Sequence, residues 1–483
     1  MADERWGDET EQLLRRTADM AIDYLRTLPD RPVRPDATLE ELRQTLGGQL
    51  PEDGEAAADV IETLVRRAEP GLMASSGPRF FGFVIGGSLP AAVAADWMTS
   101  AWDANAGLFV LGPALAVVEE TAAHWLLDIF GLPSSASVGF TTGCQMSNFV
   151  GLAAGRRSVL LHHGWDVERD GLQGAPEVTV VAGDEVHVTV PIALQMLGLG
   201  NARLKRAQAD GQGRMRPSAL RELLATIDGP VIVSAQLGNV NTGAFDPIDE
   251  IADVVHEHPG AWLHVDGAFG LWAAATPELR HHVRGMEKAD SWATDGHKWL
   301  NVPYDSGIVI VRDPVAHRAA MMLQAGYLIP ARGDERDPAD WVPEFSRRAR
   351  GWAVYAALRS LGRSGVADLI ERCCRLARRM ADRLKGADGV EILNDVALNQ
   401  VLVRFGGDDA LTRDVVRRVQ DEGTCWLSGS TWHRLGVMRI SVSNWSTTDE
   451  DADRSVDAIL RCYAAATNAA AAPVSASAPT VLA

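Results

Sequence analysis

The chain has 483 residues, of which 46% are hydrophobic and 23% are charged, a globular composition that excludes a disordered or fibrous protein. Asp and Glu outnumber Lys and Arg by 64 to 46, so the net charge is −18 and we expect no nucleic-acid partner. No run approaches the roughly 20 apolar residues of a membrane helix, so we expect no membrane contact. The five cysteines form no CxxC pair and residues 1–8 contain no apolar signal segment, which predicts free thiols in the cytoplasm.

Two segments near the N-terminus, residues 9–27 and 55–68, show helical periodicity. A connection rich in Pro and Asp, residues 28–36, separates them. This part is too small and too interrupted to build a core of its own. We therefore interpret residues 1–76 as a helical arm that packs on a second subunit, which predicts a homodimer.

Short apolar runs alternate with helical segments from about residue 77 onward, which predicts a mostly parallel sheet covered on both faces. We assign residues 77–324 to this large α/β domain. Asp246 followed by Pro247 is typical of a helix start with the carboxylate as N-cap. The expected strands are Val178–Ala182, Val231–Ala235, Trp262–Val265 and Ile308–Val311, and the expected helices are Pro191–Leu197, Pro217–Thr226 and Pro247–His256.

The remainder predicts a smaller C-terminal α/β domain over residues 346–467. Before it, residues 328–344 are rich in Pro, Asp, Arg and Gly. Long loops are uncommon unless they are functional, so we interpret residues 325–345 as a mobile active-site loop. Residues 468–483 are mostly Ala, Pro, Ser and Val, which predicts a disordered tail. Within the smaller domain we expect helices at residues 349–361 and 366–385 and a strand at residues 438–442.

Lys298 stands between a predicted strand and an apolar stretch, directly after His297. A His–Lys pair alone is more often a surface or capping feature. The functional alternative is an amine that condenses with an aldehyde. Desolvation by neighbouring tryptophans would then depress the pKa of Lys298 and make it a nucleophile near neutral pH.

Asp266 follows the predicted strand Trp262–Val265 and precedes Gly267 and the small Ala268. Taken alone, such a carboxylate is as often a helix N-cap or turn residue as a functional one. At the carboxyl edge of a parallel sheet it can instead be the counter-charge of a protonated heterocyclic nitrogen. Ala268 would then leave room for a flat ring.

Gly143, Cys144 and Gln145 open a helical stretch after two threonines, and such a helix start can bind a phosphate. An ordinary capped turn explains this segment equally well. Neither a GxGxxG nor a Walker motif is present, which disfavours a dinucleotide or a nucleoside triphosphate. His187 lies just beyond the predicted strand Val178–Ala182, and it is either an ordinary histidine or a ring that stacks on a flat cofactor.

A phosphate site, a stacking histidine, a partner for a ring nitrogen and a lysine amine together indicate pyridoxal 5′-phosphate (PLP). Their order resembles the PLP-dependent group II amino-acid decarboxylases from about Pro78 to Trp445, and the triplet His297-Lys298-Trp299 is the most specific match. The resemblance implies the type I PLP-dependent transferase fold of the aspartate-aminotransferase superfamily. It also implies a PLP-binding large domain and a carboxy-lyase that converts an L-amino acid into an amine and CO2.

The resemblance further implies roles for individual residues. Lys298 forms the Schiff base, Asp266 is the partner of the pyridine nitrogen, and His187 stacks on the ring and can relay a proton. Cys144 and Gln145 stand where the family commonly has Gly and Thr. The cofactor-binding residues that it implies are Gly143, Cys144, Gln145, His187, Asn241, Asp266, Ala268, His297 and Lys298.

One departure from the family concerns the proton donor. Amine-forming members carry a loop tyrosine just before a tryptophan, and that position falls near Pro338, so Tyr327 is the nearest substitute. Tyr327, His187 or water could supply the proton. Otherwise the product is an aldehyde formed by decarboxylative oxidative deamination, or the chain is a transaminase, an aldol-type lyase or a non-catalytic partner protein on this fold.

Three further residues are candidate substrate contacts. Arg439, on the strand at residues 438–442, could bind a substrate carboxylate, although a structural ion pair is a slightly better explanation. Phe80 and Phe81 resemble the family's substrate-channel entrance, and buried core aromatics are the plain alternative. No histidine spacing matches a metalloprotease motif, so we expect no metal. The acidic net charge favours a neutral or cationic substrate side chain.

Overall fold

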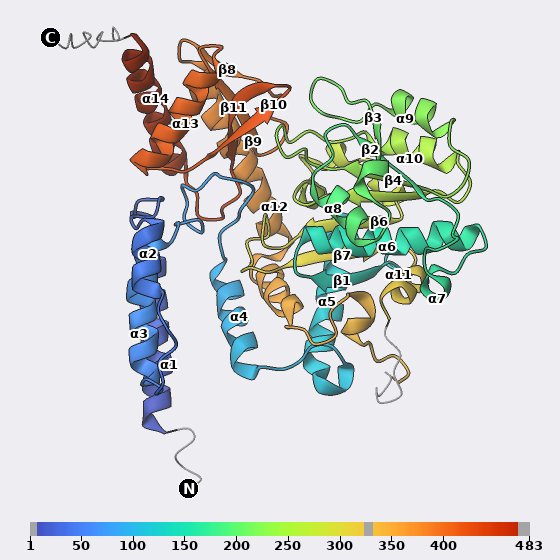
Figure 1. Ribbon diagram of the computed structural model, residues 1–483, viewed down its shortest axis with the longest axis horizontal. Coiled ribbons are helices and arrows are strands. Elements are labelled where there is room, and N and C mark those ends of the chain that lie inside the picture. Colours follow the sequence, from blue (N-terminus) through green and yellow to red (C-terminus); the bar gives the residue numbers. More distant parts are fainter. Residues whose placement is uncertain (1–6, 323–331, 472–483) are drawn as a thin grey trace, which may run out of the picture.

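The computed structural model describes residues 7–322 and 332–471. A seven-stranded sheet forms the centre of this part of the chain (Figure 1). Its strands are β1 (Ser137–Thr141), β2 (Thr179–Gly183), β3 (Lys205–Ala207), β4 (Val231–Gln236), β5 (Trp262–Asp266), β6 (Ser291–Asp295) and β7 (Gly307–Val311). Their order is β1-β7-β6-β5-β4-β2-β3, in which only β7 runs antiparallel to its neighbours. The mostly parallel sheet predicted from the sequence is confirmed.

Helices cover both faces of this sheet because its inner strands are apolar on both sides. In β7, Ile308 and Ile310 belong to one buried cluster and Val309 and Val311 to another, as the two-residue period of a strand requires. The cluster of Val309 contains α6, α8 and α11, whereas the cluster of Ile308 contains α5, α9 and α10. The helices are α4 (Pro90–Trp102), α5 (Pro113–Phe130), α6 (Cys144–His162), α7 (Val167–Asp170), α8 (Thr189–Met196), α9 (Pro217–Leu224), α10 (Ile248–His256) and α11 (Pro314–Met321).

Asp246 does not cap α10, so that local prediction is wrong. Pro247 occupies the N-cap position, and the buried Asp246 carboxylate instead accepts the backbone N–H groups of Met215 (2.7 Å) and Gln236 (2.8 Å). Burial raises the pKa of Asp246 to about 7. Here contacts with distant segments outweigh a local capping pattern.

The C-terminal part contains a four-stranded antiparallel sheet of order β10-β11-β9-β8, packed against helices. The two helices predicted at residues 349–361 and 366–385 form one element, α12, which bends at Gly362 where φ is 63°. The last helix reaches Ala471, so the first residues of the predicted tail 468–483 are helical. The elements are α12 (Arg350–Lys385), β8 (Val390–Ile392), β9 (Gln400–Phe405), α13 (Asp409–Glu422), β10 (Ser428–Trp432), β11 (Leu435–Ser441) and α14 (Asp449–Ala471).

The predicted active-site loop 325–345 differs from a simple surface loop. Its described part contains a 3₁₀ turn, Pro338–Trp341, that packs on α11 and β1. Pro338 and Ala339 are buried, and the N–H of Ala339 donates to the Gly107 carbonyl (2.9 Å). Tyr327 lies outside the described residues.

The N-terminal helices stand beside the rest of the molecule as a long hairpin (Figure 1). They are α1 (Asp8–Thr27), α2 (Leu39–Leu46) and α3 (Ala57–Ala68). None of the three contains a buried residue, although each is amphipathic. Among the described residues, no helix has the length and apolar character needed to span a membrane.

Candidate active site

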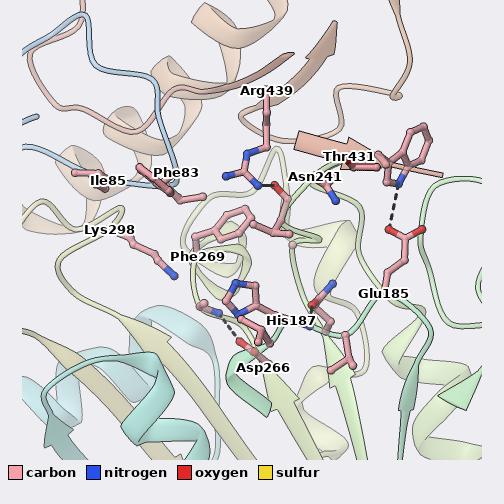
Figure 2. Close-up of a pocket in the computed structure, with 18 of the residues that line it drawn as sticks. Phe83, Ile85, Glu185, His187, Asn241, Asp266, Phe269, Lys298, Thr431 and Arg439 are labelled. Carbon is pink, nitrogen blue, oxygen red and sulfur yellow. Dashed lines mark hydrogen bonds between the residues drawn. The ribbon is translucent and has the colours of Figure 1, made fainter. Parts of the chain in front are cut away.

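A cavity of about 720 Å³ lies where β4 and β5 end and where the C-terminal sheet faces them (Figure 2). Parallel strands commonly build sites at this edge. The wall includes Thr431 and Trp432 from β10. The structure brings six of the predicted site residues together in this lining, namely His187, Asn241, Asp266, Ala268, Lys298 and Arg439.

Lys298 lies in the connection between β6 and β7, with Nζ 2.9 Å from Oδ2 of Asp295. Burial lowers the pKa of Lys298, but the nearby Asp295 carboxylate outweighs burial, so this pKa lies above its ordinary value. The expectation of a depressed pKa is therefore wrong, because the sequence did not reveal the ion pair. The amine becomes a nucleophile only after it leaves this pair and loses its proton.

Asp295 is a site residue that the sequence analysis missed. It ends β6 with a side chain only 2% exposed, and its Oδ1 accepts the backbone N–H of Cys144 at 2.6 Å. That N–H belongs to the first residue of α6, where the sequence predicted phosphate. The sequence feature that could have identified Asp295 is the presence of an acidic residue three positions before Lys298. In the structure, a carboxylate rather than a free donor therefore faces this helix N-terminus.

Asp266 lies at the end of β5, as predicted, and is 3% exposed. Its Oδ2 accepts the side-chain amide of Asn148 (3.0 Å), and its Oδ1 accepts the backbone N–H of Ala268 (3.2 Å). The thiol of Cys144 is 3.5 Å from Oδ1. These donors hold a buried carboxylate in one orientation at the cavity floor.

His187 follows β2 and is held at both its backbone and its ring. Its backbone N–H donates to Oε1 of Gln236 (3.2 Å), and its Nδ1 is 2.9 Å from the Thr189 hydroxyl. Burial, aided by the positive charges of Lys298 and Arg439, lowers the pKa of His187. The ring is therefore uncharged near pH 7, which suits contact with the face of a flat cofactor.

Four of the predicted cofactor contacts, Gly143, Cys144, Gln145 and His297, are not part of the cavity lining. Cys144 and His297 meet Asp295, and a Cβ built on Gly143 would be 3.2 Å from the His297 ring. Burial raises the pKa of Cys144 well above its usual range, so this side chain is a neutral thiol. Gln145 is exposed to solvent. Asn241 lies in the lining and accepts the Ser430 hydroxyl of β10 at 2.9 Å.

The aromatic pair Phe80 and Phe81 is placed in the core, at 3% and 1% exposure. Phe80 stacks on Trp426 with ring centroids 5.1 Å apart. Phe83 and Ile85 line the cavity in their place. The sequence therefore predicts the segment but not the side chains that face the site.

Arg439 reaches the cavity from β11 and is 8% exposed. One Nη donates to the Val240 carbonyl (3.2 Å), while Nε has no hydrogen-bond partner among the described residues. Within the described chain no carboxylate lies within ion-pair distance of this guanidinium. Burial lowers the pKa of Arg439 to about 10, so the group stays charged near pH 7. The structure does not support the structural ion pair that the sequence analysis favoured.

Tyr304 is a second residue that the sequence analysis did not single out. It lines the cavity, and its ring stacks on His297 with centroids 4.3 Å apart. Tyr304 is 60% exposed in the single chain, and partial desolvation of its phenol raises its pKa, so the phenol keeps its proton near pH 7. It therefore places a possible proton donor in the wall that also contains Lys298.

This set of groups fits PLP. Lys298 offers an amine for the aldehyde, Asp266 a buried carboxylate for the ring nitrogen, and His187 an uncharged ring for one face. The small Ala268 leaves space beside them. The carboxylate of Asp295, which faces the N-terminus of α6, would repel a phosphate bound there.

Comparisons with known proteins agree with this geometry. A family profile described as the pyridoxal-dependent decarboxylase conserved domain matches residues 40–405. The aromatic-L-amino-acid decarboxylase of Bacillus atrophaeus is 26% identical over 460 residues, which cover 92% of this chain and 93% of that protein. The 4-hydroxyphenylacetaldehyde synthase of Rhodiola rosea is 26% identical over 461 residues, which cover 90% of this chain and 91% of that protein. The crystal structure of Oryza sativa TDC with PLP and tryptamine matches the fold with a TM-score of 0.88 at 24% identity, covering 96% of this chain and 99% of that one.

The family profile spans 366 of the 483 residues and includes Lys298, Asp266 and His187. It also includes the complete seven-stranded sheet. The match therefore covers both the scaffold and the chemical groups of the cavity. The chain belongs to the pyridoxal-dependent decarboxylase family and is a PLP-dependent carboxy-lyase that acts on an amino acid.

Proposed function

We propose that the enzyme decarboxylates an L-amino acid with a large aromatic side chain and releases the corresponding amine. The observation that carries this proposal is the wall of the cavity that contains Lys298 and Asp266, to which Phe83, Ile85 and Trp432 contribute apolar surface. Burying an aromatic ring against such a wall is favourable by about 25 cal/mol per Å² of apolar surface. Similarity to the aromatic-L-amino-acid decarboxylase of Bacillus atrophaeus supports the same substrate class.

PLP, when bound, supplies a sink for the electrons of the breaking carbon–carbon bond. Lys298 would hold its aldehyde carbon, and Asp266 would hold a proton on its ring nitrogen. His187 would lie against the ring and exclude water from that face. Gly143, Cys144 and His297 would lie near its phosphate.

Arg439 would bind the substrate carboxylate. Its guanidinium is buried, charged and without a carboxylate partner in the described chain, so an incoming carboxylate gains a charge-assisted hydrogen bond there. This contact would fix the direction of the bond to be broken. The carboxylate loses its charge when it leaves as neutral CO2, because the electron pair of the broken bond passes to the electron sink that PLP would supply. The contact with Arg439 would then weaken, which favours release of CO2.

A panel of amino acids tests the proposed substrate class. We expect CO2 and equimolar amine from the aromatic amino acids, and no comparable turnover of glutamate. Trp432→Ala should raise KM for the best substrate about tenfold, as expected for the loss of an aromatic contact of roughly 1.5 kcal/mol, with a smaller change in kcat. Preference for an acidic amino acid, or no effect of Trp432→Ala on KM, would refute the proposal.

A second outcome, an aldehyde product, is favoured by one observation. The sequence has no tyrosine between Tyr327 and Tyr355, the region where amine-forming relatives carry their loop tyrosine. The chain is also similar to a protein named 4-hydroxyphenylacetaldehyde synthase. We propose the phenol of Tyr304, in the cavity wall, as the proton donor to the substrate carbon, with Tyr327, outside the described residues, as the alternative.

Tyr304→Phe is expected to lower amine formation by about 10²–10⁴-fold, because it removes the general acid from the cavity wall. The aldehyde share of the product should rise at the same time. Tyr327→Phe is the matched variant and should leave rate and products unchanged. Chromatographic measurement of amine and aldehyde distinguishes the two tyrosines as donors. A loss of amine in Tyr327→Phe, with no change in Tyr304→Phe, would assign the proton to Tyr327.

We propose that the chain divides into an arm at residues 1–76, a cofactor-binding domain at residues 77–324, a loop at residues 325–345 and a small domain at residues 346–467. The large sheet falls in the second range and the four-stranded sheet in the fourth.

The cysteines bear on the cellular compartment. Four of the five cysteines fall in the small domain, and all five are buried free thiols. This supports a reducing compartment, for which we propose the cytoplasm.

We further propose a homodimer assembled through the arm. The side chains of Leu14, Leu39 and Leu64 are 57%, 63% and 52% exposed in the single chain. Leu64→Asp should therefore yield monomers by light scattering, since it places a charge in the apolar contact. Val315→Asp, which changes a 72% exposed side chain on α11, should stay dimeric. A fully active wild-type monomer at assay concentration would overturn this proposal.

A further inference from the structure

A chain of hydrogen bonds runs from the cavity floor into the core behind Asp266. The Asn148 amide donates to Asp266 (3.0 Å), and Oδ1 of Asn148 is 2.9 Å from Nε2 of His264. Nδ1 of His264 is 2.8 Å from the Ser291 hydroxyl, which in turn accepts Nε1–H of Trp262 (2.9 Å). Asn148, His264 and Ser291 are fully buried, and Trp262 is 4% exposed.

The groups at the two ends of this chain fix its direction. A carboxylate only accepts, so the NH2 group of Asn148 faces Asp266 and its oxygen faces His264, whose Nε2 therefore carries the hydrogen. At the other end the indole N–H of Trp262 only donates. Ser291 therefore accepts from Trp262 and gives its own hydrogen to Nδ1 of His264.

The imidazole in the middle must then carry a single hydrogen. Burial lowers the pKa of His264 to about 4, so the ring is neutral under physiological conditions. Every donor in the chain consequently points toward Asp266. Aligned hydrogen bonds polarise one another, and their effect accumulates at the terminal carboxylate.

We propose that Asn148 and His264 are positioning residues that hold the Asp266 carboxylate in the orientation that meets the pyridine nitrogen of PLP, so that this nitrogen keeps its proton. The inference rests on the assigned PLP-dependent reaction. Ionised Asp266 accepts a charge-assisted hydrogen bond from Asn148, which is stronger than a neutral one.

The surrounding packing is consistent with a dedicated contact between α6 and β5. A Cβ built on Gly151, one turn after Asn148, would be 2.8 Å from Cε1 and 2.9 Å from Nδ1 of His264. Glycine at this position therefore lets α6 approach the imidazole closely. The helix that provides Asn148 is in this way set at hydrogen-bond distance from His264.

The sheet itself provides a matched control. His264 is paired in register with Ser234 on β4 and with Ser291 on β6. Both serines are buried, but the Ser234 hydroxyl has no hydrogen-bond partner among the residues that the structure describes. Ser291→Ala and Ser234→Ala thus delete the same group on the two sides of one histidine, and only the first breaks the chain.

The experiment uses holoenzyme reconstituted with ¹⁵N-labelled PLP. The ¹⁵N resonance of the pyridine nitrogen, the visible absorbance, kcat and KM are measured for wild type, Asn148→Leu, Ser291→Ala and Ser234→Ala. We expect Asn148→Leu to lower kcat about 10- to 100-fold, the range for a hydrogen bond to a charged group, with KM changed less than about threefold. Its nitrogen resonance should move toward the unprotonated position.

Ser291→Ala should lower kcat about fivefold and shift the resonance in the same direction, whereas Ser234→Ala should match wild type within about twofold. The inference is overturned if Asn148→Leu and Ser291→Ala keep the wild-type resonance, or if Ser234→Ala changes it as much as Ser291→Ala does. If Asn148→Leu does not fold, the comparison of Ser291→Ala with Ser234→Ala tests the inference by itself. A wild type that turns over no aromatic amino acid refutes the proposed substrate class instead, because the nitrogen resonance is measured without substrate.

Discussion

Lys298→Ala is expected to abolish covalent attachment of the cofactor and to lower decarboxylation by about 10⁴-fold or more, as for other covalent catalytic groups. The sequence makes this test unusually clear because it contains only four lysines, Lys205, Lys288, Lys298 and Lys385. Borohydride reduction of the wild type should leave the cofactor on the peptide that contains Lys298. Label on any of the other three lysines would contradict the assignment.

Lys288→Ala is the matched control for this substitution. Lys288 is also ion-paired, with Asp249 and Asp253 at 2.7 Å each, but it lies away from the cavity lining. Its removal should leave labelling and turnover unchanged. Unfolding should be followed for both variants, because Lys298→Ala also leaves the buried Asp295 carboxylate without its cation.

Asp266→Ala should give the second largest effect, a loss of about 10²–10⁴-fold in kcat, because the ring nitrogen loses the group that keeps it protonated. The free energy of unfolding should fall by only about 1–3 kcal/mol, the cost of leaving the Asn148 amide and the Ala268 N–H without their acceptor. Denaturant titration and steady-state kinetics separate the two quantities.

The control for Asp266 is Asp246→Asn, at another buried carboxylate that accepts two backbone N–H groups but is not itself part of the cavity lining. We expect this variant to lose stability while kcat stays near the wild-type value. If Asp266→Ala instead lost its fold and kept its specific activity, the electronic role of Asp266 would be refuted.

The scaffold was largely predictable because its strands are continuous apolar runs. Residues 231–235 and 308–311 are fully buried, as such runs require in a sheet covered on both faces. Lys298 and Asp266 were found from their chemistry and their order along the chain. These two residues follow neighbouring parallel strands, so the topology brings them together once the strands are correctly identified.

The features that the sequence did not reveal depend on contacts between distant segments. The Oδ1 of Asp295 accepts the backbone N–H of Cys144 across 151 positions. The ion pair of the same carboxylate with Lys298 keeps the pKa of Lys298 above its ordinary value. In the segment after Pro78, Phe83 adopts the left-handed backbone region, with φ at 54°. A strand or helix pattern does not anticipate such a conformation, so the choice between Phe80 and Phe83 as the cavity residue required the three-dimensional structure.

The hairpin formed by β6 and β7 has a consequence for how the enzyme acquires its cofactor. Asp295 pairs with Gly307 across these strands, so residues 296–306, with Lys298 among them, are tethered at both ends to the buried centre of the sheet. Opening this connection requires partial unfolding of the central strands rather than local fraying. The entropic cost of ordering the backbone of this segment is thus met when the chain folds, so cofactor binding requires only that the Lys298 amine leave its ion pair with Asp295.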